Sequence, residues 1–125
     1  MRNSGPGYKQ NLEHRVATAP AGARVKVVFA GEVIADSDRA IRLEEGNYPP
    51  VYYVPRGDVK MERFEKTAHH SYCPFKGEAS YFTLQAGGKT AANAVWSYET
   101  PYDEVAVIKE HVAFYPNRVD QISVG

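Results

Sequence analysis

The stretch from Ser80 to Glu99, SYFTLQAGGKTAANAVWSYE, contains two strand patterns joined by a glycine turn. Phe82 and Leu84 recur at every second position before the letters GGK, and Trp96 and Tyr98 do so after them. Side chains with a period of two lie on one face of a strand. A Gly-Gly pair between two such runs is typical of a hairpin turn. The stretch therefore predicts an antiparallel hairpin.

Further strand patterns lie on both sides of this hairpin. Residues 24–36, RVKVVFAGEVIAD, continue as a strand pattern on either side of Gly31, which predicts a second hairpin with a tight turn. Short strands are also expected within residues 40–45, 48–55 and 119–124. Because prolines punctuate residues 48–55, we expect that strand to lie at an edge of the sheet.

The clearest helix signal lies in TPYDEVAVIKEHV, residues 100–112. Thr100 is a candidate N-cap, Pro101 suits the first helical position, and Asp103 fills the capping-box position. The sequence therefore predicts an α+β fold that is mostly β. We expect a compact antiparallel sheet domain with one principal C-terminal helix near residues 101–112.

The length of 125 residues favours a single domain. Residues 1–23 are rich in Gly, Pro and Ala and follow neither the strand nor the helix period. We therefore expect an N-terminal arm, flexible or draped over the domain, and a single mainly-β domain over residues 24–125. The composition of the arm predicts that removing residues 1–7 leaves the melting temperature nearly unchanged.

Charge and composition limit the class of protein. The 15 basic and 15 acidic residues balance, so the net charge does not favour a nucleic-acid partner. No apolar run approaches the roughly 20 residues that span a bilayer, so no membrane association is expected. The single cysteine excludes an internal disulfide, and the polar N-terminus lacks the apolar segment of a signal peptide. These features predict a cytoplasmic protein.

Five blocks of sequence, in order, carry a resemblance: VVFAGEVIADS, YPPVYYVPRGDV, YCPFKGEASYF, AVWSYETPY and HVAFYPNRVD. From about Arg24 to Asp120 the chain resembles a bacterial family, domain of unknown function family 427. The resemblance implies a compact, mainly-β fold that is similar to the β-tent sheets of zinc-ribbon-derived domains. It implies no established activity, although members are sometimes labelled nucleotidyltransferases.

The loop HHSYCPFKGEAS, residues 69–80, gathers the side chains with the most chemical potential. Cys73 is the candidate nucleophile, because a neighbouring cation such as Lys76 favours the thiolate. His70 is the candidate general base, since a Cys–His pair needs only hydrogen-bond reach. Against this reading, a free cysteine is often a small buried hydrophobe and Lys76 can be solvated. We predict catalytic roles for these three residues, with Lys76 as the main functional charge.

Aromatic and basic side chains complete the predicted site. Trp96 and Tyr98 are expected to wall a pocket, with Lys76 and Arg56 at its mouth, because rings and cations together suit a small anionic or planar ligand. The predicted ligand-binding residues are Arg56, His69, Tyr72, Tyr81, Trp96 and Tyr98. His14 and His111 are interpreted as surface residues.

The sequence gives little support to metal chemistry. A ribbon-type structural zinc needs four cysteines, and adjacent histidines such as His69 and His70 point to opposite faces of a strand. Asp36 and Asp38 have the spacing for one Mg²⁺ of a nucleotidyltransferase, but a D-x-D after a hairpin is usually a solvated strand end. There is no Gly-rich phosphate loop of the P-loop type. We therefore expect no metal and no cofactor.

Two functions of different classes remain open on the sequence alone. The first is a cytosolic small-molecule-binding domain, with or without enzymatic activity, whose site surrounds the Cys73–Lys76 loop. The second is a non-catalytic protein-interaction module or a domain that forms a homodimer. Convergence of Cys73, Lys76 and a histidine on one pocket would favour the first.

Overall fold

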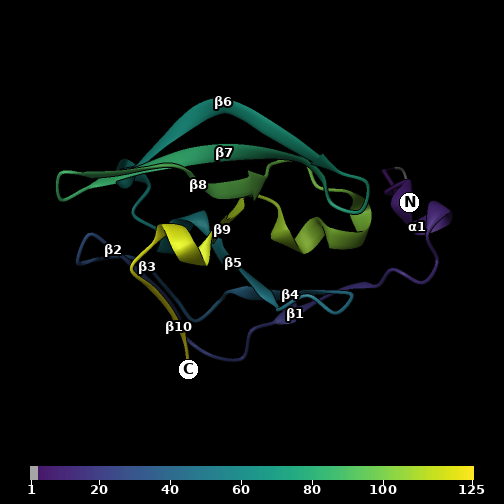
Figure 1. The fold of residues 1–125 in the computed structure, drawn as a ribbon. Coiled ribbons are helices and arrows are strands. Elements are labelled where there is room, and N and C mark those ends of the chain that lie inside the picture. The colour runs from purple at the N-terminus through teal and green to yellow at the C-terminus, as the bar shows by residue number, and fades with distance from the viewer. Residues whose placement is uncertain (1–2) are drawn as a thin grey trace.

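The computed structural model describes residues 3–125, which form ten strands in two antiparallel sheets (Figure 1). One sheet has seven strands in the order β1-β4-β5-β9-β8-β7-β6, and the other has three in the order β10-β2-β3. The strands are β1 (Val16–Pro20), β2 (Val25–Phe29), β3 (Glu32–Ser37), β4 (Ile41–Glu45), β5 (Val51–Pro55), β6 (Phe64–Cys73), β7 (Gly77–Ala86), β8 (Lys89–Tyr98), β9 (His111–Phe114) and β10 (Gln121–Val124). The helical segments are short: α1 (Gly7–Gln10), η1 (Arg56–Asp58), η2 (Met61–Arg63), η3 (Asp103–Ile108) and η4 (Pro116–Arg118).

Both predicted hairpins are confirmed. Strands β7 and β8 pair with Tyr81 opposite Trp96, and Gly87 and Gly88 make the turn between them. Both glycines have a positive φ, which explains why the turn needs residues without a β-carbon. Strands β2 and β3 form the second hairpin around Gly31, and β10 adds to β2 as the last strand.

The seven-stranded sheet buries side chains on both faces. In Figure 1, β6, β7 and β8 lie above, β1 and β4 lie below, and β5 and β9 connect the two levels, so the sheet is strongly curved. One face carries Phe82 and Leu84, which pack against the three-stranded sheet in the larger core. The other face carries Tyr53, Tyr81 and Tyr98, which pack with η3 in a second core.

The prediction of a principal C-terminal helix is wrong. The fold is mostly β, and the helical segments of the described residues are all short. The segment forms the short 3₁₀ turns of η3, interrupted at Val105, where φ is −125° and ψ is 29°. No side chain caps its start, and Glu110 has a positive φ before β9 begins. Strand β9 is central in the sheet and fully buries Val112 and Ala113. Burial of this strand outweighs the local helix signals, because tertiary packing overrides propensity.

Residues within the expected arm pack against the domain. Strand β1 pairs with β4 along its whole length. The Gly7 N–H donates to the Pro74 carbonyl at 3.0 Å, and the Tyr8 hydroxyl donates to the Phe75 carbonyl at 2.9 Å. A β-carbon on Gly7 would lie 2.8 Å from the Phe75 ring, so the close approach requires glycine. No helix within residues 3–125 is long and apolar enough to cross a membrane.

Candidate functional site

Lys76 lies in the turn between β6 and β7 and points toward the end of β4. Its ammonium donates to Glu45 Oε1 at 2.5 Å, and its side chain is only 12% exposed. The turn closes because Gly77, at the start of β7, has a φ of 112°. The main predicted functional cation is therefore half of a mostly buried ion pair and not a free charge at a pocket mouth.

Glu45 also accepts a hydrogen bond from His14, so three side chains form what we call the Glu45 chain: His14, Glu45 and Lys76. The His14 Nε2–Glu45 Oε2 distance is 2.8 Å. Burial would raise the pKa of Glu45, but the hydrogen bonds from Lys76 and His14 outweigh it and hold that pKa below its ordinary value. Glu45 was not among the residues predicted from the sequence, and His14 was interpreted as a surface residue. No local pattern signals this chain, because it depends on the docked arm.

Cys73 and the histidines do not form a catalytic pair. His70 stands opposite Ser80 in the β6–β7 register and Cys73 stands opposite Gly77, so the two side chains alternate to opposite faces. The His70 Nδ1 lies 3.7 Å from a Glu78 carboxylate oxygen and is solvent-exposed. His69 shares the Cys73 face, but four residues of strand separate them by about 13 Å. Neither imidazole is within hydrogen-bond reach of the thiol.

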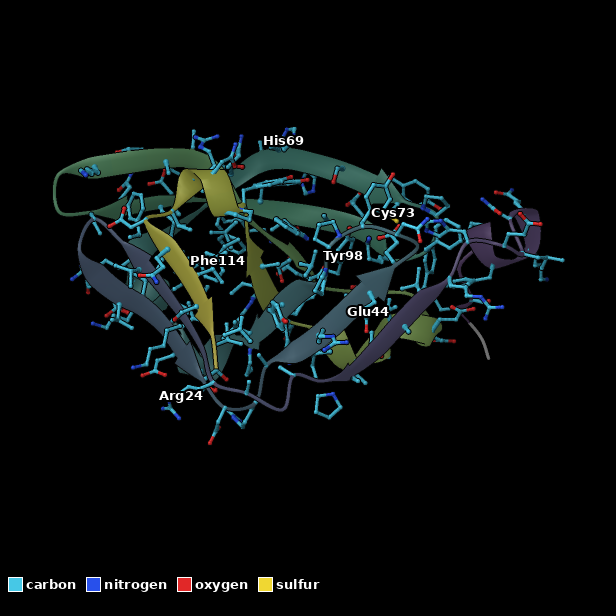
Figure 2. The ribbon with its side chains drawn as sticks, turned by 60° about the horizontal axis from the view of Figure 1, so that its bottom comes forward. Arg24, Glu44, His69, Cys73, Tyr98 and Phe114 are labelled. Carbon is cyan, nitrogen blue, oxygen red and sulfur yellow. The ribbon has the colours of Figure 1, made fainter. Side chains whose placement is uncertain are left out.

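Figure 2 shows that Cys73 and His69 lie apart along β6. Cys73 lies at the end of the strand near the docked N-terminal segment, whereas His69 lies farther along it. The His69 ring contacts the Tyr81 ring, with centroids 4.5 Å apart. The Tyr81 hydroxyl is 2.8 Å from Ser71 Oγ. His69 therefore belongs to an aromatic and hydroxyl cluster and not to the cysteine.

Arg56 lies on the other face of the sheet from Trp96 and Tyr98. Its guanidinium donates to Ser97 Oγ at 3.1 Å and to Glu99 at 3.3 Å. Ser97 lies between Trp96 and Tyr98 in β8, so its side chain points to the opposite face of the sheet from the two rings. The Lys66 ammonium also binds Glu99, at 2.7 Å. This lysine hydrogen bond is the main cause that lowers the pKa of Glu99 to about 2. Arg56 and Lys76 thus do not flank one pocket.

The predicted aromatic residues divide between core and surface. Trp96 Nε1 donates to the Tyr53 hydroxyl at 3.2 Å, and its ring stacks on Tyr115 with centroids 4.5 Å apart. Tyr98 is buried, and this burial raises its pKa well above the ordinary value. Tyr72 is exposed, with its hydroxyl 2.7 Å from that of Tyr102. Among the predicted residues, Trp96 lines a cavity between the two sheets.

That cavity, the wedge pocket, has a volume of about 310 Å³. Strands β5 and β9 pair only through Val54–Val112 and Pro55–His111, and beyond these pairs the pocket opens between the strands and the three-stranded sheet. Figure 2 shows one of its residues, Phe114, beside β10. The wedge pocket is lined by Val25, Val27, Pro50, Val51, Tyr52, Val54, Trp96, Phe114, Pro116, Ile122 and Val124. None of these side chains is charged.

A second, more polar cavity lies at the other end of the fold. It has a volume of about 440 Å³ and is lined by His14, Gly46, Asn47 and Tyr48. We call it the His14 recess. His14 lines the recess and also belongs to the Glu45 chain, so the recess is linked to Lys76 through the Glu45 carboxylate.

Metal-ligating side chains do not gather within the described chain. Residues 3–125 contain no group of three or more His, Cys, Asp or Glu side chains that could hold an ion. Asp36, which the nucleotidyltransferase reading used, pairs with Arg24 Nε at 2.7 Å. Cys73 is a free cysteine of intermediate burial.

Comparison with known proteins identifies the family of the chain but does not indicate an activity. No curated protein matches the chain. One family model matches residues 17–125, which is nearly the whole chain, and its description is "Domain of unknown function (DUF427)". The match agrees with the resemblance carried by the five sequence blocks. The chain therefore belongs to the family Domain of unknown function (DUF427).

Proposed function

We propose that the protein is a small-molecule-binding domain whose ligand occupies the wedge pocket. The observation that carries the proposal is the cavity itself, which has a volume of about 310 Å³ and is lined by eleven uncharged, largely apolar residues from both sheets and the adjoining segments. Ligand sites typically have volumes of about 300–1,000 Å³ and mostly apolar walls. The pocket meets both conditions.

The lining favours a planar or apolar ligand without a charge. Tyr52, Trp96 and Phe114 provide ring surfaces, and burial of a ring against them is worth about 25 cal/mol per Å² of apolar area. An anionic ligand has less support, because the two predicted cations, Lys76 and Arg56, each pair with a carboxylate. An unpaired charge in this pocket would lose hydration without compensation.

The surroundings of Cys73 also favour ligand binding over covalent catalysis. A cysteine nucleophile needs a base within about 3 Å, and neither His69 nor His70 is that close to Cys73. The alternative of an interaction module or a homodimer stays a prediction. The exposed edge strand β6 is the feature that favours it, since unpaired strand edges can add a strand from another chain.

Trp96 gives a direct test, because it is the only tryptophan in the chain and stands in the pocket wall. We expect the uncharged planar dye 6-propionyl-2-(dimethylamino)naphthalene to show saturable energy transfer from Trp96. Ile122→Phe fills the pocket and should weaken dye binding about tenfold, or about 1.4 kcal/mol. Val107→Phe, a matched change at an exposed site in η3, should leave the affinity unchanged. Equal affinities in the two variants would refute the proposal.

A further inference from the structure

The His14 recess contains an imidazole that is held in place from two sides. One ring face stacks against Phe75, with centroids 4.2 Å apart and planes inclined by 33°. Nε2 is fixed by Glu45 Oε2, while Lys76 binds the other oxygen of the same carboxylate. The imidazole therefore keeps one orientation, which is the condition for a preorganised polar group in a binding site.

The hydrogen bond to Glu45 also decides which nitrogen can act on a ligand. An ionised carboxylate only accepts hydrogen bonds, so the hydrogen of the neutral imidazole resides on Nε2. Nδ1 is then an acceptor, and within residues 3–125 it has no hydrogen-bond partner. A carboxylate behind a histidine also stabilises the imidazolium that forms when the free nitrogen takes a proton. The arrangement is that of a general base.

His14 lines the recess, and the part of its ring nearest to Gly46 is Cε1. His14 Cε1, the atom between the two nitrogens, lies 4.0 Å from the position that a β-carbon on Gly46 would occupy. Gly46 belongs to the recess wall together with Asn47 and Tyr48. The Tyr48 ring is 71% exposed at this wall and offers a surface on which a planar group can stack.

We propose that the His14 recess is a second binding site, for a planar phenol-class ligand whose hydroxyl donates its hydrogen to His14 Nδ1. The ligand ring stacks on Tyr48. When the proton transfers, the ligand O–H bond breaks, an Nδ1–H bond forms, and the products are a phenolate and an imidazolium that faces Glu45. No oxidant, metal or cofactor is needed for this step.

The probe is 4-nitrophenol, whose anion absorbs visible light while the neutral form does not. At a pH just below the ionisation midpoint of the free probe, the protein should produce a saturable increase in the anion band. His14→Gln should remove this increase, and His111→Gln, a matched change of another histidine outside the recess, should retain it. Tyr48→Ala, at an exposed position that leaves His14 in place, should raise the dissociation constant about tenfold, or about 1.4 kcal/mol.

Each remaining outcome would overturn the proposal. One is the absence of a saturable increase with the unchanged protein, and another is an equal increase with His14→Gln. A third is loss of the increase in Ile122→Phe, which would locate the probe in the wedge pocket. The methyl ether 4-nitroanisole has the same ring but no hydroxyl hydrogen. If it displaces 4-nitrophenol with equal affinity, the hydrogen bond to Nδ1 does not contribute.

Discussion

The wedge pocket and the His14 recess are built in opposite ways. Two sheets enclose the wedge pocket with uncharged side chains, so the same contacts that form the core also shape the cavity. The His14 recess depends on one carboxylate that holds a lysine and a histidine, and on a docked N-terminal segment. The first cavity should therefore respond to changes in packing and the second to changes in charge and in the arm.

The two cavities also differ in how they relate to the family match. The family match begins at residue 17, within β1, so it contains every residue of the wedge pocket. His14 lies before the matched region, whereas its partner Glu45 lies inside it. The wedge pocket is built by the matched domain alone, and the recess also needs His14, which lies before the matched residues.

The largest expected effect is on stability and comes from a change in the wall of the wedge pocket. Phe114→Ala should lower the free energy of unfolding by about 3–5 kcal/mol, because Phe114 is 5% exposed and its truncation leaves a cavity. Urea denaturation followed by circular dichroism measures the change. A loss below about 1 kcal/mol would show that the pocket wall can collapse, and that the two sheets are not held by this contact.

The next largest effect on stability comes from a change in the Glu45 chain, and it depends on pH. Glu45→Gln should cost about 1–3 kcal/mol at neutral pH, because Lys76 is left mostly buried beside a neutral amide. The folded pKa of Glu45 lies below the ordinary 4.5, so its contribution is present above that pH and is lost as the pH falls through the lower, folded value. Melting curves from neutral to acid pH should therefore converge for the two proteins. Parallel curves throughout would contradict the role given to Glu45.

A third change tests the docked arm. Gly7→Ala should destabilise the protein by about 1–3 kcal/mol, because the new methyl group would lie 2.8 Å from the Phe75 ring. The matched control is Gly57→Ala, whose methyl group would meet nothing closer than Arg39 Nη2 at 3.7 Å. Thermal melts compare the two. Equal melting temperatures would restore the earlier expectation that the first residues contribute little.

The smallest effect on stability is expected for Tyr48→Ala. Tyr48 is 71% exposed and makes no side-chain hydrogen bond within the described residues, so the change should stay within about 0.5 kcal/mol. Its effect should appear instead in 4-nitrophenol binding. A melting temperature lowered by many degrees would mean that Tyr48 supports the fold and is not only a ligand surface.

Local patterns were sufficient for the hairpins and insufficient for the helix. Alternation around Gly31 and around Gly87–Gly88 predicted both hairpins, because a turn and its two strands are adjacent in sequence. The cap signals near Thr100 were also local, but they lost to the burial of β9 between β5 and β8. Strand β5 was expected at an edge and is interior. Pro55 is tolerated there because it ends the strand.

The candidate site was harder to predict, because it depends on contacts between distant residues. The sequence correctly placed Trp96 on the same face as Tyr98, yet Trp96 reaches the wedge pocket and Tyr98 is buried in the second core. Lys76 and Arg56 were expected to share a pocket mouth, but Lys76 binds Glu45 at the end of β4, whereas Arg56 binds Ser97 and Glu99. Glu45 joins residues that are 31 positions away on both sides, and no short motif encodes that.

The indole N–H of Trp96 reports directly on ligand binding in the wedge pocket, because a chain with one tryptophan has one indole resonance. In a ¹H–¹⁵N titration with 6-propionyl-2-(dimethylamino)naphthalene, that resonance and the backbone amides of Ile122 and Val124 should shift saturably and with one dissociation constant. The amides of Gly46 and Asn47, at the His14 recess, should not move. An unmoved indole resonance at saturating dye would contradict the assignment of ligand binding to the wedge pocket.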